Sequence, residues 1–186
     1  MKPGVSGFAL YVPKLRVPLA AWCAWTGAPA DKVEAVVGRS FRVPGPGESV
    51  YTMAAAAALD LILRYDVDPQ RVGYLALGTE SSTDNSAGAV LVRGMLDEAL
   101  AALGRPPLAR ACEVPEIKQA CLGGIYGLKG AARYVAADGR GSRAIVVSAD
   151  IAEYERGSSG EQTQGAGAVA MLVDAEPALV ELDLDR

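Results

Sequence analysis

Apolar runs of strand length alternate along this chain with longer segments whose apolar residues recur at helical spacing. We predict helices over residues 19–25, 31–37, 49–63, 87–103 and 121–136. We predict strands over residues 7–13, 72–78, 109–114, 143–150, 165–173 and 178–184. Runs 72–78 and 143–150 are apolar at nearly every position, which is typical of strands covered on both faces. The alternation predicts an α/β layered fold built on parallel βαβ units.

Composition narrows the class of protein. A chain of 186 residues, 51% hydrophobic and 22% charged, is long and apolar enough to form one globular domain. A net charge of −4 gives no reason to expect nucleic acid or an anionic membrane as partner. The sequence has no spanning apolar run and no signal-peptide pattern at its start, so we expect a cytoplasmic protein. Three cysteines without CxxC spacing favour neither a disulfide framework nor a metal site.

The chain contains no histidine. A Ser-His-Asp triad, a Cys-His pair and an HExxH metal motif are therefore excluded within these residues. Any acid or base must be a carboxylate, a lysine, a tyrosine or a group from another polypeptide.

Cys121 is the candidate nucleophile. It stands in the segment 118–128, where it precedes the glycine pair Gly123 and Gly124 at the predicted start of a helix. Unpaired backbone N–H groups and the positive end of the helix dipole favour a thiolate there. Paired glycines cost helix stability, and they permit close approach of another backbone or a thin substrate. The alternative is a small buried cysteine that fills core volume.

Two carboxylates follow predicted central strands. Glu80 follows strand 72–78, where polar side chains line the crevice of an open α/β sheet. Apolar walls there would suit a proton-transfer group. The sequence fits equally well a Glu80 that caps the next helix or faces solvent. For Asp150 we expect a structural role, as a turn residue that binds local backbone. The GxGxxA strings at 165–170 and 139–144 lack the strand-then-helix context of a dinucleotide site.

Four segments together carry a family resemblance. Residues 48–54 (ESVYTMA), 78–86 (GTESSTDNS), 118–124 (KQACLGG) and 160–171 (GEQTQGAGAVAM) resemble 3-hydroxy-3-methylglutaryl-CoA synthase in order and spacing. The resemblance implies the thiolase fold, in which two similar α/β halves form a five-layer αβαβα sandwich that works as a dimer. Residues 1–186 are then a single N-terminal half-domain of βαβαβαββ order.

The resemblance also implies roles for individual residues. Cys121 would accept an acetyl group from acetyl-CoA or an acyl carrier protein, and its backbone N–H would help to form an oxyanion hole. Glu80 would act as general acid/base in the attack on acetoacetyl-CoA. Thr163, Tyr154 and Gly160 would contact substrate. No permanently bound cofactor and no metal are implied, and the product would belong to the mevalonate route to isoprenoids, although branched-chain and polyketide pathways stay open.

The family carries its catalytic histidine, an asparagine and a second oxyanion donor in the other half. We therefore expect a separate polypeptide to supply that half, in a dimer of heterodimers. We expect it to dock along the strand edge formed by residues 165–184. Two alternatives stay open, a subunit of a thiolase-fold acyltransferase or ketoacyl synthase, and a non-catalytic scaffold half.

Overall fold

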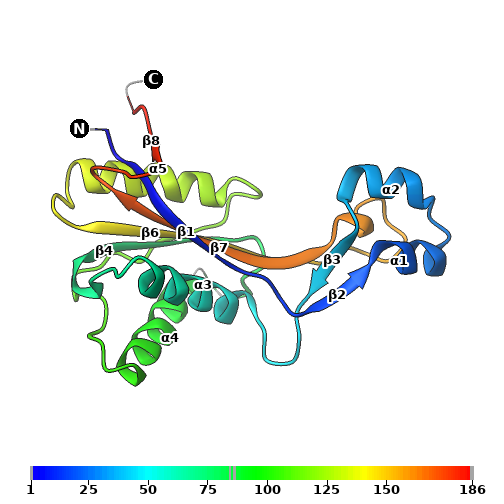
Figure 1. Cartoon of the computed structure of the whole chain (residues 1–186), viewed down its shortest axis with the longest axis horizontal. Coiled ribbons are helices and arrows are strands. Elements are labelled where there is room, and N and C mark those ends of the chain that lie inside the picture. The colour runs from blue at the N-terminus through cyan, green and yellow to red at the C-terminus, as the bar shows by residue number, and fades with distance from the viewer. Residues whose placement is uncertain (1, 84, 86, 185–186) are drawn as a thin grey trace.

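A computed structural model describes residues 2–83, 85 and 87–184, so Asp84 and Ser86 of the segment 78–86 lie outside it. The strands are β1 (Gly4–Tyr11), β2 (Leu15–Pro18), β3 (Ser40–Val43), β4 (Val72–Gly78), β5 (Glu116–Ile117), β6 (Arg143–Ala152), β7 (Gly165–Asp174) and β8 (Val180–Glu181). The helices are α1 (Leu19–Thr26), α2 (Ala30–Val37), α3 (Val50–Arg64), α4 (Gly88–Ala102) and α5 (Gly123–Ala136), with 3-10 turns η1 (Pro69–Arg71) and η2 (Glu161–Thr163). Figure 1 shows a sheet body joined to a smaller lobe of β2, β3, α1 and α2.

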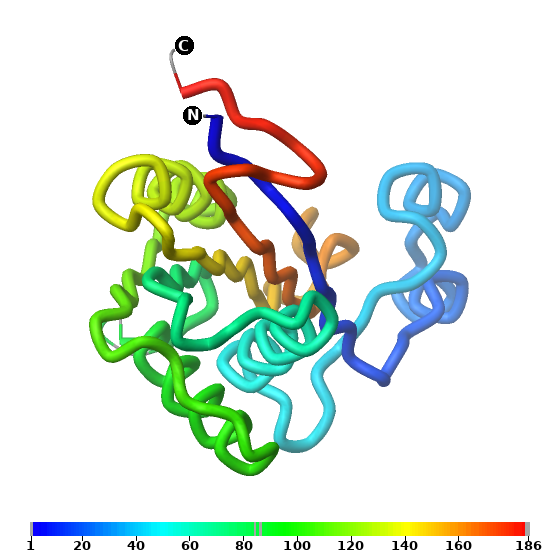
Figure 2. The backbone as a smooth tube through the Cα atoms, turned by 60° about the vertical axis from the view of Figure 1, so that its left-hand side comes forward, coloured from blue at the N-terminus to red at the C-terminus, as the bar shows by residue number. Residues whose placement is uncertain are grey.

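The sheet body is a mixed six-stranded sheet between helical layers. Its strand order is β5-β4-β6-β7-β1-β8. Strand β4 runs parallel to β5 and β6, whereas β6, β7, β1 and β8 pair antiparallel. Helices α3 and α4 lie on one face of the sheet and α5 lies on the other (Figure 2). The predicted α/β layered class is confirmed, with parallel pairing confined to β4, β5 and β6.

The predicted strand over residues 109–114 is wrong. This segment is irregular apart from a single bridge between Tyr74 and Glu113, and the strand that follows it, β5, has two residues. The guanidinium of Arg93 donates to the carbonyls of Ala109 at 3.0 Å and Cys112 at 3.2 Å. A side chain of α4 therefore satisfies carbonyls that a neighbouring strand would otherwise bind, and Pro115 cannot donate to a ladder.

The expected docking edge over residues 165–184 is wrong for residues 165–174, whereas β8 does lie at the edge of the sheet. Strand β7 pairs with β6 over its whole length and with β1 on its other side. It therefore lies inside the sheet and has no unpaired edge. The predicted strand over 178–184 is reduced to β8, which pairs with β1 at only two positions. Its pairing with β1 follows from two hydrogen bonds that hold residues 179 and 182 to the start of the chain.

One face of the sheet, which we call the covered face, carries the main core. Helix α3 begins with a capping box, in which the side chains of Ser49 and Thr52 each bind the other's backbone N–H. Its buried alanines let the helix lie close against β1, β6 and β7. Leu75, Ile145 and other strand residues with no exposed surface meet α3 and α4 there.

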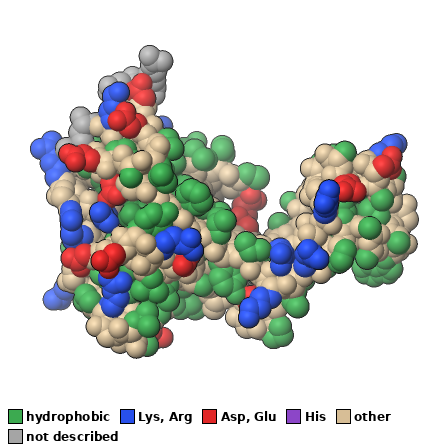
Figure 3. All heavy atoms as spheres, in the orientation of Figure 1, with side chains coloured by type: hydrophobic (Ala, Val, Ile, Leu, Met, Phe, Trp, Pro, Cys, Tyr) green, Lys and Arg blue, Asp and Glu red, His purple; other side chains and the backbone are tan. Residues whose placement is uncertain are grey.

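The opposite face, which we call the open face, is only partly covered. Helix α5 packs over β4 and β6 and buries Ala76, Val146 and their neighbours. Over β1 and β7 the side chains of Phe8 and Leu10 stay 51% and 55% exposed. They pair across the strands with Met171 and Val169, so all four point to the face that α5 covers elsewhere. Figure 3 shows hydrophobic side chains at the surface in the middle of the sheet body.

The small lobe has its own apolar cluster. Leu19, Trp22, Cys23 and Val33 are buried between α1 and α2, and Phe41 of β3 packs against them. The two helices were predicted from the sequence. The antiparallel pair of β2 and β3 was not predicted, because the two strands stand on either side of both helices in the sequence and each has only four residues. Within the described residues we find no helix with the length and apolar character that a membrane crossing requires.

Candidate active site

A cavity of about 530 Å³ opens at the carboxyl ends of β4 and β6. It is lined by residues of three segments that are far apart in the sequence: Glu80, Ser81, Cys121, Asp150, Ile151, Ala152, Glu153 and Tyr154. Cys121, Glu80 and Tyr154, which the sequence singled out separately, therefore share one cavity. A thiol and a carboxylate facing one solvent-accessible space can together perform covalent and proton-transfer chemistry.

Cys121 lies just before α5 and not in its first turn. The helix begins at Gly123, with Leu122 as N-cap. Ala120, the residue before Cys121, has φ of +42°, a left-handed backbone conformation that residues other than glycine rarely adopt. A tight turn closes this segment through a hydrogen bond from the N–H of Leu122 to the carbonyl of Gln119. The strained turn presents Cys121 to solvent, as is common where structure holds a reactive group in place.

The three thiols differ sharply in environment. Cys121 is exposed, whereas Cys23 and Cys112 are buried. Burial in the covered core raises the pKa of Cys112 to about 11, so this thiol stays protonated near neutral pH. The interpretation of Cys121 as a small core residue is therefore wrong, and the buried cysteine of the sheet body is Cys112.

Glycines bring α5 against the ends of the strands. A Cβ atom on Gly78 would lie 2.3 Å from the backbone nitrogen of Gly124, and one on Gly123 would lie 2.6 Å from the carbonyl oxygen of Ile117. No side chain fits at these contacts. The close approach predicted for the glycine pair thus takes place against the chain's own strands, and it sets the distance between the Cys121 turn and the sheet.

Asp150 has the structural role that we expected, but not as a turn residue that binds local backbone. It lies inside β6 and not in a turn, and its partners are about 70 residues away in the chain. Its Oδ1 accepts hydrogen bonds from the backbone N–H groups of Glu80 at 2.7 Å and Ser81 at 3.1 Å. The hydroxyls of Thr79 and Ser81 donate to the same oxygen at 3.0 and 2.7 Å. Asp150 therefore fixes the segment 79–83, which we call the Glu80 loop.

Glu80 does not cap the next helix. Helix α4 begins after Ala87, and its first N–H, that of Gly88, donates to the carboxylate of Glu116. Glu80 instead lines the cavity with Cys121, while its own backbone is held by Asp150. A carboxylate on an anchored backbone at the mouth of a cavity is placed for proton transfer to a bound molecule.

Tyr154, Gly160 and Thr163 belong to the connection between β6 and β7. A Cβ atom on Gly160 would lie 2.9 Å from the ring of Tyr154, so glycine there makes room for the ring. The hydroxyl of Thr163 donates to the carbonyl of Gly160 at 2.7 Å. Thr163 lines a neighbouring hollow of about 300 Å³ that shares Asp150 and Ala152 with the main cavity. Tyr154 therefore lies in the main cavity, whereas Gly160 and Thr163 lie beside it.

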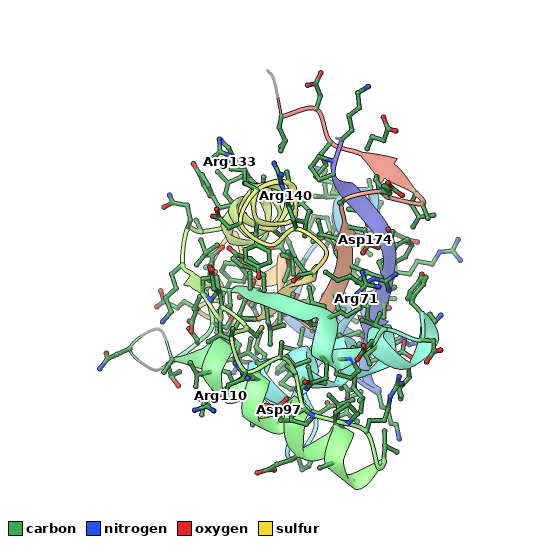
Figure 4. The ribbon with its side chains drawn as sticks, turned by 90° about the vertical axis from the view of Figure 1, so that its left-hand side faces the viewer. Arg71, Asp97, Arg110, Arg133, Arg140 and Asp174 are labelled. Carbon is green, nitrogen blue, oxygen red and sulfur yellow. The ribbon has the colours of Figure 1, made fainter. Side chains whose placement is uncertain are left out.

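The opposite end of the sheet body carries paired charges. Arg143 forms an ion pair with Asp174 at 3.1 Å, and the guanidinium of Arg71 donates to the carbonyl of Gly141 at 2.9 Å. Figure 4 views this end and shows Arg71 near Asp174, with Arg133 and Arg140 around α5. A hollow of about 370 Å³ lies there, lined by Arg71, Arg143, Asp174 and Glu176 among others. Its charges largely neutralise one another, and no thiol lines it.

Sequence reasoning missed Glu116, whose side chain is fully buried. A glutamate after a proline in a short polar segment carries no signal of burial. Its partners, Ser82 and Gly88, are about 30 residues away in the chain, and only the folded sheet brings them together.

Comparison with known proteins gives one consistent result. The family model described as hydroxymethylglutaryl-coenzyme A synthase N terminal matches residues 2–178. Hydroxymethylglutaryl-CoA synthase from Enterococcus faecalis is 34% identical over the whole chain, which covers 46% of that protein. A solved structure of MvaS in complex with 3-hydroxy-3-methylglutaryl coenzyme A is 36% identical with a TM-score of 0.88, covering 98% of this chain and 42% of that one.

A further solved structure is the HMG synthase of the curacin biosynthetic pathway in complex with acetyl donor-ACP. It is 25% identical with a TM-score of 0.83, and the match covers 99% of this chain and 44% of that one. The chain therefore spans less than half the length of the relatives that it matches.

Proposed function

Because the chain belongs to the hydroxymethylglutaryl-coenzyme A synthase N-terminal family, we propose that it provides the nucleophile-bearing half of a synthase that condenses an acetyl group with acetoacetyl-CoA. One observation carries the proposal. The exposed thiol of Cys121 and the carboxylate of Glu80 line the same cavity at the carboxyl end of the sheet.

The chemistry follows from these two groups. The thiolate of Cys121 attacks the carbonyl carbon of an acetyl thioester, and the carrier thiol leaves, which forms acetyl-Cys121. The carboxylate of Glu80 removes a proton from the acetyl methyl group, and the resulting carbanion attacks the ketone carbon of acetoacetyl-CoA. The carboxyl group of Glu80 then returns its proton to the resulting alkoxide, which restores the carboxylate. Water then hydrolyses the thioester and frees Cys121 and the 3-hydroxy-3-methylglutaryl product.

The cavity supplies further groups. The backbone N–H of Cys121 stabilises the oxyanion formed during attack on the acetyl carbonyl. Tyr154 contacts the bound acyl chain, Gly160 makes room for the Tyr154 ring, and Thr163 lines the adjoining hollow for acetoacetyl-CoA. One solved relative is in complex with 3-hydroxy-3-methylglutaryl coenzyme A and another with acetyl donor-ACP, so both kinds of carrier are candidates for the donor. Acetyl-CoA is the donor that we propose to test first.

The half-domain 1–186 works with a second half-domain, carried by a separate polypeptide that resembles the C-terminal half of the family and supplies the histidine. The open face supports this part of the proposal. Phe8, Leu10 and Val169 on the sheet and Ile125 and Tyr126 on α5 are exposed apolar side chains. The second half would bury them. We propose a dimer of these heterodimers.

The cell compartment follows from the chemistry. The nucleophile is a free thiol and its exposure makes it oxidisable. A reducing cytoplasm keeps such a thiol in the active form. In that compartment the product would enter the mevalonate route to isoprenoids.

The first experiment tests the thiol. We incubate the chain with acetyl-CoA, alone and together with a C-terminal half from the family, and map acetyl adducts by mass spectrometry. We expect an adduct on Cys121, no adduct in Cys121→Ala, and an unchanged adduct in the matched variant Cys112→Ala. No adduct in either preparation would favour the scaffold alternative.

The second experiment tests the carboxylate. In the assembled enzyme we expect Glu80→Gln to keep the acetyl adduct and to lower the condensation rate by about 10²–10⁴-fold, the range typical of a general acid/base. Glu155→Gln, in an exposed glutamate between β6 and β7 that does not line the cavity, is the control and keeps the rate. Transfer of acetyl to other acceptors without condensation would favour the acyltransferase alternative.

A further inference from the structure

Glu116 bridges the two segments that carry the reacting groups. Its side chain has no exposed surface. One carboxylate oxygen, Oε2, accepts the N–H of Gly88 at 2.5 Å, the first residue of α4. The other, Oε1, accepts the hydroxyl of Ser82 and lies 3.8 Å from the ammonium group of Lys118. A buried carboxylate at this position is compensated by a helix N-terminus, a hydroxyl and a cation.

The same contacts tie the Glu80 loop to the Cys121 turn. The ammonium group of Lys118, three residues before Cys121, donates to the carbonyl of Ser82 at 3.0 Å. Ser82 lies two residues after Glu80. Asp150 holds the front of the loop at Glu80 and Ser81, and Glu116 holds its far side at Ser82. The loop is therefore fixed from two sides, by Asp150 of β6 and by Glu116 and Lys118 of the segment that leads into Cys121.

We propose that Glu116 is a positioning residue that sets the placement of Glu80 relative to Cys121, through its bonds to Ser82 and Gly88 and its pairing with Lys118. The expected effect of Glu116 on turnover rests on the proposed function. The claim that Glu116 holds the Glu80 loop rests on the contacts alone. A displacement of about 1 Å between reacting groups can cost about 100-fold in rate, so one buried anchor can matter to turnover without touching substrate.

Glu116→Gln is the informative substitution because it keeps the size of the side chain. Its amide has one acceptor oxygen. If that oxygen accepts Gly88, the NH₂ group faces both the Ser82 hydroxyl and the Lys118 ammonium group, and the ion pair is lost. The matched control is Glu113→Gln, the same change at an exposed position of the same segment. Ser82→Ala removes one of the bonds and serves as a second variant in case Glu116→Gln folds poorly.

Turnover in the assembled enzyme is the first readout. We expect Glu116→Gln to lower kcat for condensation by about 10- to 100-fold with KM changed less than about threefold. We expect Ser82→Ala to lower kcat less and Glu113→Gln to leave it unchanged. In a Glu80→Gln background, Glu116→Gln should add little further loss, because its effect passes through Glu80. An equal loss in both backgrounds, or a loss shared by Glu113→Gln, would overturn the proposal.

The second readout does not need catalysis. Iodoacetamide alkylation of Cys121 and hydrogen exchange at the amides of Glu80, Ser81 and Gly88 are measured on the full chain. We expect exchange to rise and the alkylation rate to change by more than about threefold in Glu116→Gln, and neither to change in Glu113→Gln. If the wild-type assembly fails to condense acetyl-CoA with acetoacetyl-CoA, the proposed function is overturned. The exchange and alkylation measurements then still test whether Glu116 positions the Glu80 loop. Unchanged exchange and alkylation would overturn the positioning role itself.

Discussion

The two faces of the sheet differ in how completely they are covered, and the difference coincides with a division of roles. The covered face packs Leu75 and Ile145 under α3 and α4 without exposed surface. The open face leaves Phe8 and Leu10 half exposed, and the side chain of Asp150 points to this same side of β6. The covered face thus carries the larger part of the buried core. The open face carries the candidate site and an exposed apolar surface, which in our proposal a second half buries.

The largest contrast is predicted for one substitution made on each face. Leu75→Ala should lower the free energy of unfolding by about 3 kcal/mol, because it removes a fully buried side chain and leaves a cavity. Leu10→Ala, at an exposed position, should change it by no more than about 0.5 kcal/mol in the isolated chain. Urea unfolding followed by circular dichroism measures both. Equal losses would show that the open face is already packed in the isolated chain.

A second prediction concerns the anchor on the open face. Asp150→Asn should lower the free energy of unfolding by about 2 kcal/mol, because four hydrogen bonds to a charged acceptor weaken together. Hydrogen exchange at the amides of Glu80 and Ser81 should rise more than at the amides of β4. Loss of protection spread evenly over the covered face would contradict a local anchor.

A smaller effect of opposite sign is expected at Ala120. Glycine relieves the left-handed backbone at φ +42° but makes the unfolded chain more flexible, so Ala120→Gly should stabilise the protein by about 0.5 kcal/mol. Ala56→Gly, inside α3, should destabilise it by about 1 kcal/mol. Thermal unfolding compares the two variants. If the strained backbone at Ala120 keeps the Cys121 thiol accessible, Ala120→Gly should also slow alkylation of Cys121. An unchanged alkylation rate would show that the accessibility of the thiol does not depend on this strain.

The last prediction separates the thiols by the pH dependence of stability. The pKa of Cys112 is raised from 9.0 to about 11 by burial, so between these pH values the unfolded chain releases a proton that the folded chain keeps. Stability should therefore fall as the pH rises from 9 to 11, and Cys112→Ala should weaken that fall while Cys23→Ala retains it. Urea unfolding at pH 8 and pH 10.5 measures the change. A fall of the same size in Cys112→Ala would assign it to other groups.

The sequence predicted most accurately the elements that are covered on both faces of the sheet. Strand β4 matches its predicted bounds because seven consecutive buried positions leave only one reading. Residues 109–114 mix apolar residues with Arg110 and Glu113. Arg93 of α4 binds the carbonyls of Ala109 and Cys112, and this segment makes a single isolated bridge to β4. The local pattern therefore gave a weaker signal here, and the group that binds these carbonyls lies elsewhere in the chain.

The site was predictable as residues but not as an arrangement. Cys121 and Glu80 stand out through glycines and strand ends, which are local signals. The support from Asp150 and Glu116 depends on contacts about 70 and 30 residues away. In the sequence, neither Asp150 inside a strand nor Glu116 after a proline can be distinguished from an ordinary surface acid. Their roles emerge only when the strands are placed side by side.

The placement of β1 has a consequence for synthesis on the ribosome. This strand leaves the ribosome well before its main partner β7, whose Asp174 lies opposite Gly4. The nascent chain must therefore hold an apolar strand without its partner until β7 has been translated. This sheet order predicts that a chaperone binds β1 on the ribosome and is released once residues 165–174 have left the exit tunnel.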